Sequence, residues 1–284
     1  MKNTAPIVSI CSLAYNHENF VRDCLEGFLM QETTFPVEII IHDDASTDKT
    51  ADIIREYSEK YPDLITAILQ KENKYSQGIR PMSEYIFPKA RGKYIALCEG
   101  DDYWTDPQKI QKQVGFMEKN PEVVLTYHTF KNVDVNKEIK DYREKPLPCT
   151  FMFINDLEDM PDPVNCPNGD RFLLTYFSLK GSLKYLENIK PSVRRVHEGG
   201  VMSMVSMEVK LDRQVKTWSA IYEAFKESKI SEKLLIKKNT FIYRQLLWKW
   251  KNGDEGFLKI IFYPIKVRYL RLYKLLIRSL INSD

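Results

Sequence analysis

The chain has 284 residues, a length that accommodates one large α/β domain and a C-terminal extension. Its 43% apolar and 29% charged residues exclude a mainly disordered chain. The net charge of +3 gives no reason to expect a nucleic acid as partner.

Cysteine usage and the N-terminus bear on the compartment. The five cysteines are odd in number and form no Cys-x-x-Cys pair, which favours buried free thiols in a reducing compartment over a disulfide framework. No signal-peptide pattern is evident, and no run of about 18 uncharged apolar residues occurs. We therefore expect a cytoplasmic protein without a membrane span.

The first part of the chain alternates between strand and helix patterns. Apolar runs predict five buried strands, at residues 7–13, 37–41, 65–69, 94–98 and 123–127. Helical spacing predicts helices after the first, second and fourth of them, the second capped by Ser46 or Asp48 and the third opened by Asp106-Pro107. This alternation predicts a mostly parallel sheet with right-handed crossovers.

The pattern changes after about Phe130. Residues 131–168 hold five prolines, and we expect an irregular surface segment that either shapes a ligand pocket or is a plain long loop. A helix is expected from about Arg171, and helices from about residue 203 to the end.

Two acidic pairs stand where strands end, Asp43-Asp44 after the second and Asp101-Asp102 after the fourth. Ligands of open α/β sheets bind beyond the carboxyl ends of the strands. Neighbouring carboxylates repel each other unless a cation compensates, and hard oxygen ligands favour Mg²⁺ or Mn²⁺, which can bridge a diphosphate. Either pair can instead be an ordinary turn and helix cap.

Three motifs in residues 6–128 carry a family resemblance. They are the opening strand with Ala14-Tyr15-Asn16, the strand ending in His42-Asp43-Asp44-Ala45-Ser46-Thr47-Asp48, and Gly92-Lys93-Tyr94-Ile95 leading to Glu99-Gly100-Asp101-Asp102. In this order and spacing the chain resembles glycosyltransferase family 2. The resemblance implies a GT-A (Rossmann-like) α/β fold, a mostly parallel sheet flanked by helices, with a helical C-terminal region.

The resemblance also implies a division of the chain. Residues 1–200 would be the GT-A catalytic domain, with a nucleotide-binding half at 1–128 and an acceptor half at 129–200. Residues 201–284 would be a helical C-terminal region.

Site residues follow from the same resemblance. It implies a nucleotide-sugar site formed by Ala14, Tyr15, Asn16, Asp44, Arg80 and Asp101. Asp44 would accept a hydrogen bond from the base, most naturally uracil, and Asp101 would contact ribose or sugar. Arg80 can equally be a surface arginine.

The implied cofactor is a divalent metal, Mn²⁺ or Mg²⁺, held by Asp102 on the diphosphate. His197 would be a second metal ligand or a diphosphate contact, although Arg194-Arg195 replaces the family's Tyr-Arg before it and a structural histidine remains an alternative.

Asp170, just before the helix at 171, matches the family's general base, and a helix cap there is compatible with catalysis. It would deprotonate an acceptor hydroxyl, which attacks the anomeric carbon opposite the nucleotide and inverts it. The expected partners are a nucleotide-sugar donor, with UDP foremost, and a glycan or polyprenyl-linked acceptor.

The C-terminal tail is basic, with six lysines and arginines and one acid in residues 259–284. Residues 266–281 divide into an apolar and a basic side on a helical wheel, which suits peripheral contact with an anionic membrane at its inner face. Packing on the domain or on a second subunit, as in a homodimer, is the alternative.

Two other function classes stay open. A sugar nucleotidyltransferase would share the sheet and the metal acids, but residues 7–20 contain no glycine for its phosphate loop. A catalytically silent nucleotide-sugar-binding or scaffold protein would bind nucleotide without turnover.

Overall fold

The computed structural model describes residues 5–134, 136, 138–200 and 205–253. The chain forms two compact units. Unit 1 comprises Met1–Glu158 and Lys180–Gly200, and unit 2 comprises Asp159–Leu179 and Val201–Asp284. The units are interleaved along the chain, and the functional division at residue 200 stays a prediction.

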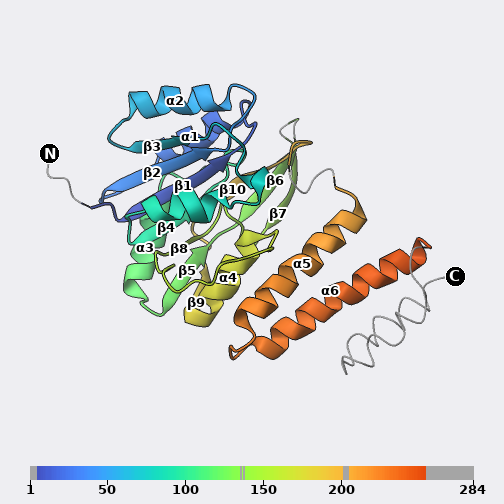
Figure 1. The fold of residues 1–284 in the computed structure, drawn as a ribbon. Coiled ribbons are helices and arrows are strands. Elements are labelled where there is room, and N and C mark those ends of the chain that lie inside the picture. Colours follow the sequence, from blue (N-terminus) through green and yellow to red (C-terminus); the bar gives the residue numbers. More distant parts are fainter. Residues whose placement is uncertain (1–4, 135, 137, 201–204, 254–284) are drawn as a thin grey trace. The chain divides into compact units, whose positions relative to one another are not determined.

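Unit 1 is built on a seven-stranded sheet of order β3-β2-β1-β4-β8-β5-β9 (Figure 1). Six of its strands pair in parallel wherever they are neighbours, and β8 alone runs antiparallel to both of its neighbours. The prediction of a mostly parallel sheet is confirmed. Its strands are β1 (Val8–Ala14), β2 (Val37–Asp43), β3 (Ile65–Leu69), β4 (Tyr94–Leu97), β5 (Val123–Tyr127), β8 (Met152–Ile154) and β9 (Ser182–Tyr185).

The expectation of an irregular surface segment at 131–168 is wrong. The segment contains β6 (Phe130–Asp134), β7 (Ile139–Arg143) and β8, and β8 lies between β4 and β5 with Met152 and Phe153 fully buried. The prolines bound these strands instead of interrupting them, and a three-residue strand is too short to show a period. A second sheet has the order β10-β6-β7, with β10 (Ser192–Val196) parallel to β6.

Three α-helices accompany the sheet in unit 1: α1 (Val21–Leu29), α2 (Thr50–Lys60) and α3 (Lys109–Lys119). Their buried residues recur at the helical spacing that predicted them, for example Ile54 and Tyr57 in α2 and Ile110, Val114 and Met117 in α3. At the start of α2 the Asp48 carboxylate accepts the backbone N–H of Thr50 at 2.9 Å. Three short helical turns not expected from the sequence follow β3, at Tyr75–Gln77, Met82–Ile86 and Phe87–Lys89.

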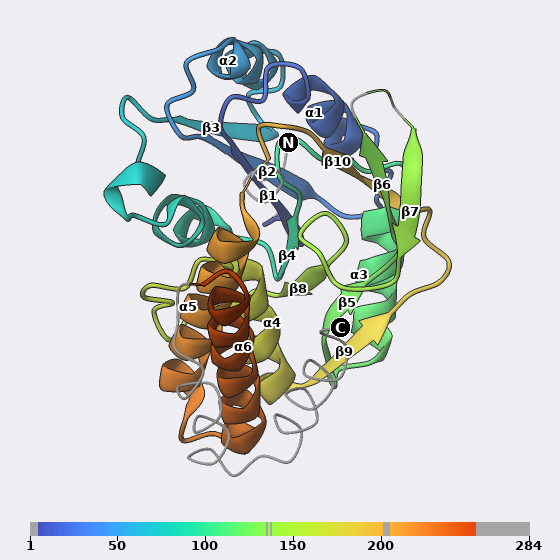
Figure 2. The same cartoon turned by 90° about the vertical axis from the view of Figure 1, so that its right-hand side faces the viewer.

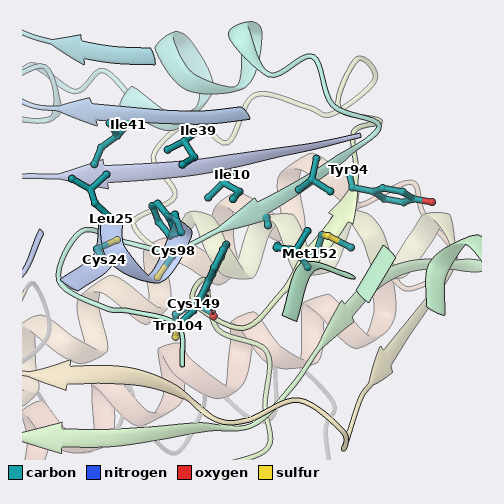
Figure 3. Packing of buried hydrophobic residues seen from close by; sticks show 14 of the residues in the cluster. Ile10, Cys24, Leu25, Ile39, Ile41, Tyr94, Cys98, Trp104, Cys149 and Met152 are labelled. Carbon is teal, nitrogen blue, oxygen red and sulfur yellow. Dashed lines mark hydrogen bonds between the residues drawn. The ribbon is translucent and has the colours of Figure 1, made fainter. Parts of the chain in front are cut away.

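The core of unit 1 packs the sheet against these helices. Figure 3 shows Ile10 and Ile39 of the sheet, Leu25 of α1, and Trp104 beside Cys149. All five cysteines are free and buried. Each large apolar side chain buried in this way contributes roughly 1.5–3 kcal/mol, so the sheet is a firm support for the turns at its edge.

Unit 2 is helical. It contains α4 (Gly169–Lys180, except for its last residue), α5 (Met207–Phe225) and α6 (Ser231–Lys251), and α5 and α6 lie side by side (Figures 1 and 2). Phe172 of α4 packs on Phe225 of α5 with ring centroids 5.0 Å apart, and Trp218 stacks on Phe241 at 6.2 Å. The helices predicted from about 171 and 203 are confirmed for the residues described.

No helix in the described part of the chain is long and apolar enough to cross a membrane. The predicted amphipathic helix at 266–281 lies outside the described residues.

Candidate nucleotide and metal site at the sheet edge

The two acidic pairs meet at one edge of the sheet. Strand β1 lies between β2 and β4, and all three run parallel, so their carboxyl ends share an edge. The backbone N–H of Asp44 donates to the carbonyl of Ala14 at 3.0 Å, and that of Gly100 donates to the carbonyl of Leu13 at 2.9 Å. The sequence therefore predicted correctly that both acidic pairs stand at strand ends of one sheet, and β1 separates the two strands that they follow.

The carboxylates of Asp43 and Asp44 both accept backbone N–H groups at this edge of the sheet. Asp43 accepts the backbone N–H of Ser46 at 3.0 Å and closes the turn after β2. The oxygens of Asp44, a residue only 2% exposed, accept the backbone N–H groups of Lys74 at 2.9 Å and Tyr75 at 3.0 Å. The turn interpretation thus holds for Asp43. Asp44 orders the segment after β3, and each of its oxygens keeps a second lone pair for a ligand.

The turn after β1 is tied to the turn after β2. The side chain of Asn16 accepts the backbone N–H of Thr47 at 2.8 Å, and its own N–H donates to Ser46 Oγ at 2.8 Å. Asn16 has a positive φ of 55°, which asparagine tolerates better than most residues. Ala14 is buried and Tyr15 is 43% exposed, so the ring of Tyr15 is accessible to a ligand at this edge.

Three carboxylates gather in the turn after β4. One ligand oxygen each of Glu99, Asp101 and Asp102 lies within 4.8 Å of the other two. The sequence reasoning assigned no role to Glu99. The signal was its place in the same short turn, which the backbone N–H of Asp102 closes by donating to the carbonyl of Glu99 at 3.0 Å.

Asp102 is almost completely buried, with 3% of its surface exposed. Its Oδ1 accepts the backbone N–H of Arg195 in β10 at 2.9 Å. Burial raises the pKa of Asp102 well above its usual value, and the charges of Asp101 and Glu99 raise it further. Positive charge at this position would therefore relieve a substantial electrostatic cost.

Asp101 has a different environment. Its Oδ2 lies 3.1 Å from His197 Nε2 and 3.9 Å from His17 Nε2. Burial raises the pKa of Asp101, but the hydrogen bond with His197 and the nearby His17 outweigh burial, so the pKa is lowered overall. Its Oδ1 is buried and has no hydrogen-bond partner among the described residues.

This carboxylate set fits a divalent cation. Oxygen ligands suit Mg²⁺ and Mn²⁺, and a cation would offset the charge repulsion that raises the pKa of Asp102. The unpartnered Asp101 Oδ1 is a further acceptor for a ligand. His197 lies beside this set and contacts it through Asp101. Its role as a metal or diphosphate ligand stays a prediction.

The two remaining predicted residues lie elsewhere in the chain. Arg80 is half-buried in the segment between β3 and the helical turn Met82–Ile86, with its carbonyl accepting the N–H of Glu84 at 3.0 Å. Asp170 lies in the first turn of α4, in unit 2. The roles of both stay predictions.

A comparison of the sequence with models of protein families matches the part of the chain that contains both acidic turns. The sequence model described as Glycosyl transferase family 2 matches residues 9–173, more than half of the chain. The chain belongs to glycosyl transferase family 2. The matched segment runs from β1 into α4 and includes both acidic pairs and Asp170. The resemblance read from the motifs is confirmed.

Individual members of the family match over shorter stretches. An uncharacterised protein of Mycobacterium tuberculosis is 49% identical over 121 residues, which cover 43% of this chain and 34% of that protein. The Escherichia coli UDP-Glc:alpha-D-GlcNAc-diphosphoundecaprenol beta-1,3-glucosyltransferase WfaP is 36% identical over 124 residues, 44% of this chain and 46% of that protein. The matches thus span about a third to a half of these curated relatives.

Solved structures share the fold. TarS of Staphylococcus aureus in complex with UDP-GlcNAc has a TM-score of 0.63 at 18% identity, over 87% of this chain and 74% of that one. A mannosyltransferase of Pyrobaculum calidifontis in complex with GDP-Man and Mn²⁺ has a TM-score of 0.57 at 13% identity, over 96% and 84%. At such identities the likeness shows the fold, and it confirms the predicted GT-A-type architecture.

Proposed function

We propose that this family 2 member is an inverting glycosyltransferase that moves a sugar from a nucleotide-sugar, most naturally a UDP-sugar, to a hydroxyl of a glycan or polyprenyl-linked acceptor. The observation that carries the proposal is the cluster of Glu99, Asp101 and Asp102 at the sheet edge that also presents Asp44. The matched WfaP is named for transfer from UDP-Glc to a diphosphoundecaprenol-linked sugar, and TarS binds UDP-GlcNAc.

The donor's base would lie against the turns after β1 and β2. Tyr15 offers an exposed aromatic face for stacking, and Asn16 sits in the turn that presents it. Asp44 is already fixed by two backbone N–H groups, so it is preorganised to accept a further N–H from a base such as uracil. Arg80 would contact phosphate or sugar.

The diphosphate would lie near the carboxylate cluster. Asp102, with Glu99 and His197 nearby, would hold a divalent cation, and Asp101 would contact ribose or sugar. Bound there, Mn²⁺ or Mg²⁺ would neutralise the charge that develops on the departing diphosphate. That charge is greatest in the transition state, where binding contributes to rate.

Asp170 would supply the base. Its carboxylate would take the proton from the acceptor hydroxyl, and the oxygen would displace the diphosphate in one step that inverts the anomeric carbon. A polyprenyl-linked acceptor would place the reaction at the inner face of the cell membrane, within polysaccharide biosynthesis.

The test is donor hydrolysis and transfer with Mn²⁺, screened across UDP-, GDP- and dTDP-sugars and a lipid-linked acceptor pool. We expect one donor to be turned over, and turnover to fall by at least a hundredfold in Asp102→Ala and in Asp170→Asn. A matched control is Glu38→Gln, which removes another buried carboxylate at the opposite end of β2, where it binds Ser9 and Arg91. This control should fold less stably and keep its turnover.

The alternatives predict other outcomes. Tight Mn²⁺-dependent nucleotide binding without turnover, with the acceptor pool supplied, would replace the transferase by the silent binding protein. Formation of nucleotide-sugar from sugar phosphate would identify a nucleotidyltransferase.

A further inference from the structure

Two histidines that are far apart in the chain converge on one oxygen of Asp101. His197, just after β10, has its Nε2 3.1 Å from Oδ2, and His17, in the turn after β1, has its Nε2 3.9 Å from the same atom. The two rings meet edge to face, with centroids 6.2 Å apart. The second oxygen of Asp101 is therefore the one left for a ligand.

The backbone of His17 is held independently of its ring. Its N–H donates to Thr50 Oγ1 at 2.7 Å, and its carbonyl accepts the N–H groups of Phe20 at 2.9 Å and Val21 at 2.8 Å, where α1 begins. These bonds involve only the backbone of His17 and not its imidazole. A change at position 17 can therefore probe the imidazole without removing the turn.

The His17 ring packs against the turn after β4, which contains Glu99 and Asp101. A Cβ added at Gly100 would lie 3.0 Å from His17 Nδ1, so the ring packs directly on the chain between Glu99 and Asp101. Only 15% of the His17 side chain is exposed. Nδ1 is buried and has no hydrogen-bond partner within the described ranges, a cost that a purely structural residue would be expected to avoid.

We propose that His17 is a positioning residue for Asp101, which it holds together with His197 so that Oδ1 stays turned to the nucleotide-sugar. This inference rests on the proposed function, because it assumes that Asp101 contacts the donor. His197 is within hydrogen-bond distance of Oδ2, and the His17 ring lies against the same oxygen at 3.9 Å. Together they restrict rotation of the carboxylate, which would otherwise have to be ordered at the moment of binding. Loss of such a supporting contact typically costs about 10-fold to 100-fold in affinity or activity.

Three replacements of His17 separate the effect of an N–H donor at the place of Nε2 from the effect of the ring's volume. His17→Gln keeps an N–H donor near the place of Nε2, His17→Asn keeps one only near Nδ1, and His17→Phe keeps a ring without a donor. The measurements are calorimetric affinity, with Mn²⁺, for whichever of UDP, GDP and dTDP the wild type binds, together with KM and kcat for donor turnover.

We expect His17→Phe and His17→Asn to weaken nucleotide-sugar affinity and raise KM by about 10-fold, with kcat changed less, and His17→Gln to remain within about 3-fold of wild type. In an Asp101→Ala background the effect of His17→Phe should disappear, because the residue acts through Asp101. His128→Gln, which alters another buried imidazole, should lower the melting temperature and leave nucleotide affinity unchanged.

Two results would overturn the inference, and they are distinguishable. Wild-type affinity and KM in His17→Phe would show that the imidazole does not position Asp101 while leaving the transferase proposal intact. Failure of the wild type itself to bind any nucleoside diphosphate would remove the proposed function and, with it, this role of His17.

Discussion

Asp101 and Asp102 are adjacent in the chain, yet their surroundings shift their pKa values in opposite directions. Asp102 is buried beside two other acids and accepts one backbone N–H, whereas Asp101 faces two imidazoles. The motif predicted that both are site residues. It could not predict this difference, because the partners come from β10 and from the turn after β1, far away in sequence.

Replacing Asp102 by its neutral isostere separates stability from function. The folded pKa of Asp102 is raised, so the stability associated with it is present at low pH and is lost as pH rises through that pKa. Asp102→Asn cannot ionise, and we expect it to be more stable than wild type at pH 7 without metal, by about 1 kcal/mol. It should lose the rise in melting temperature that Mn²⁺ gives the wild type.

Thermal unfolding with and without Mn²⁺ measures both effects. A Mn²⁺-induced rise in Asp102→Asn equal to that of the wild type would place the metal elsewhere.

Lys109 is a buried lysine that the sequence reasoning passed over. It is inaccessible to solvent, donates to Gln113 Oε1 at 2.7 Å, and lies 4.1 Å from the centroid of the Trp104 ring. Burial lowers its pKa from 10.5 to about 7. Its place in the amphipathic pattern of α3 gave no signal, because lysines on helices are usually exposed.

Because of Lys109, the free energy of unfolding should change with pH in the neutral to alkaline range. Between about pH 7 and 10.5 the unfolded chain binds a proton at Lys109 that the folded chain does not, so stability should rise with pH across that window. Lys109→Met should be more stable than wild type near pH 7 and should lack this rise. Urea unfolding at several pH values tests the prediction, and parallel curves for the two proteins would contradict it.

At the scale of elements, β1 to β5 and the three α-helices of unit 1 followed from apolar runs and helical spacing, as at β2 and α3. Strands β6 to β10 were not predicted, and β8 shows why: its three residues carry no period and stand among prolines. Its place between β4 and β5 depends on antiparallel pairing with strands about 30 and 60 residues earlier in the chain. Only the assembled sheet decides such long-range pairing.

Because β8 is an internal strand, its side chains should be costly to remove. Phe153 is fully buried, and Phe153→Ala should lower the free energy of unfolding by about 3–5 kcal/mol, the usual cost of a cavity this large. Tyr142→Ala on β7, a residue 58% exposed, should change it by less than about 0.5 kcal/mol. Denaturant unfolding measures both, and similar values for the two variants would contradict the internal position of β8.

At the scale of the whole molecule, each of the two units is built from two stretches of chain that are separated in the sequence. Residues 159–179 belong to the same unit as α5 and α6, where Phe172 packs on Phe225 and Asn168 Nδ2 donates to Thr217 Oγ1 at 2.9 Å. A boundary near residue 200 was a natural prediction, since helices dominate from there. Contacts made by α4, which lies earlier in the chain, could not be read from that change of pattern.

A chain ending at Gly200 would keep α4 but lose these partners. We expect α4 in such a fragment to expose Phe172, to bind a hydrophobic dye and to exchange its backbone amides rapidly. Hydrogen exchange of fragment and full chain gives the comparison. Equal protection of residues 171–178 in both would show that α4 is stable without α5 and α6.

The sequence by itself determined the family, the parallel α/β layout and the two acidic turns, because these depend on local runs of apolar residues and on short motifs. The tertiary structure decided what each acid does within its turn. Asp43 and Asp44 accept backbone N–H groups, Glu99 lies with Asp101 and Asp102, and His17 lies against Asp101. Hydrogen bonds form only at contact distances of about 3 Å, so these roles depend on which distant segments folding brings together.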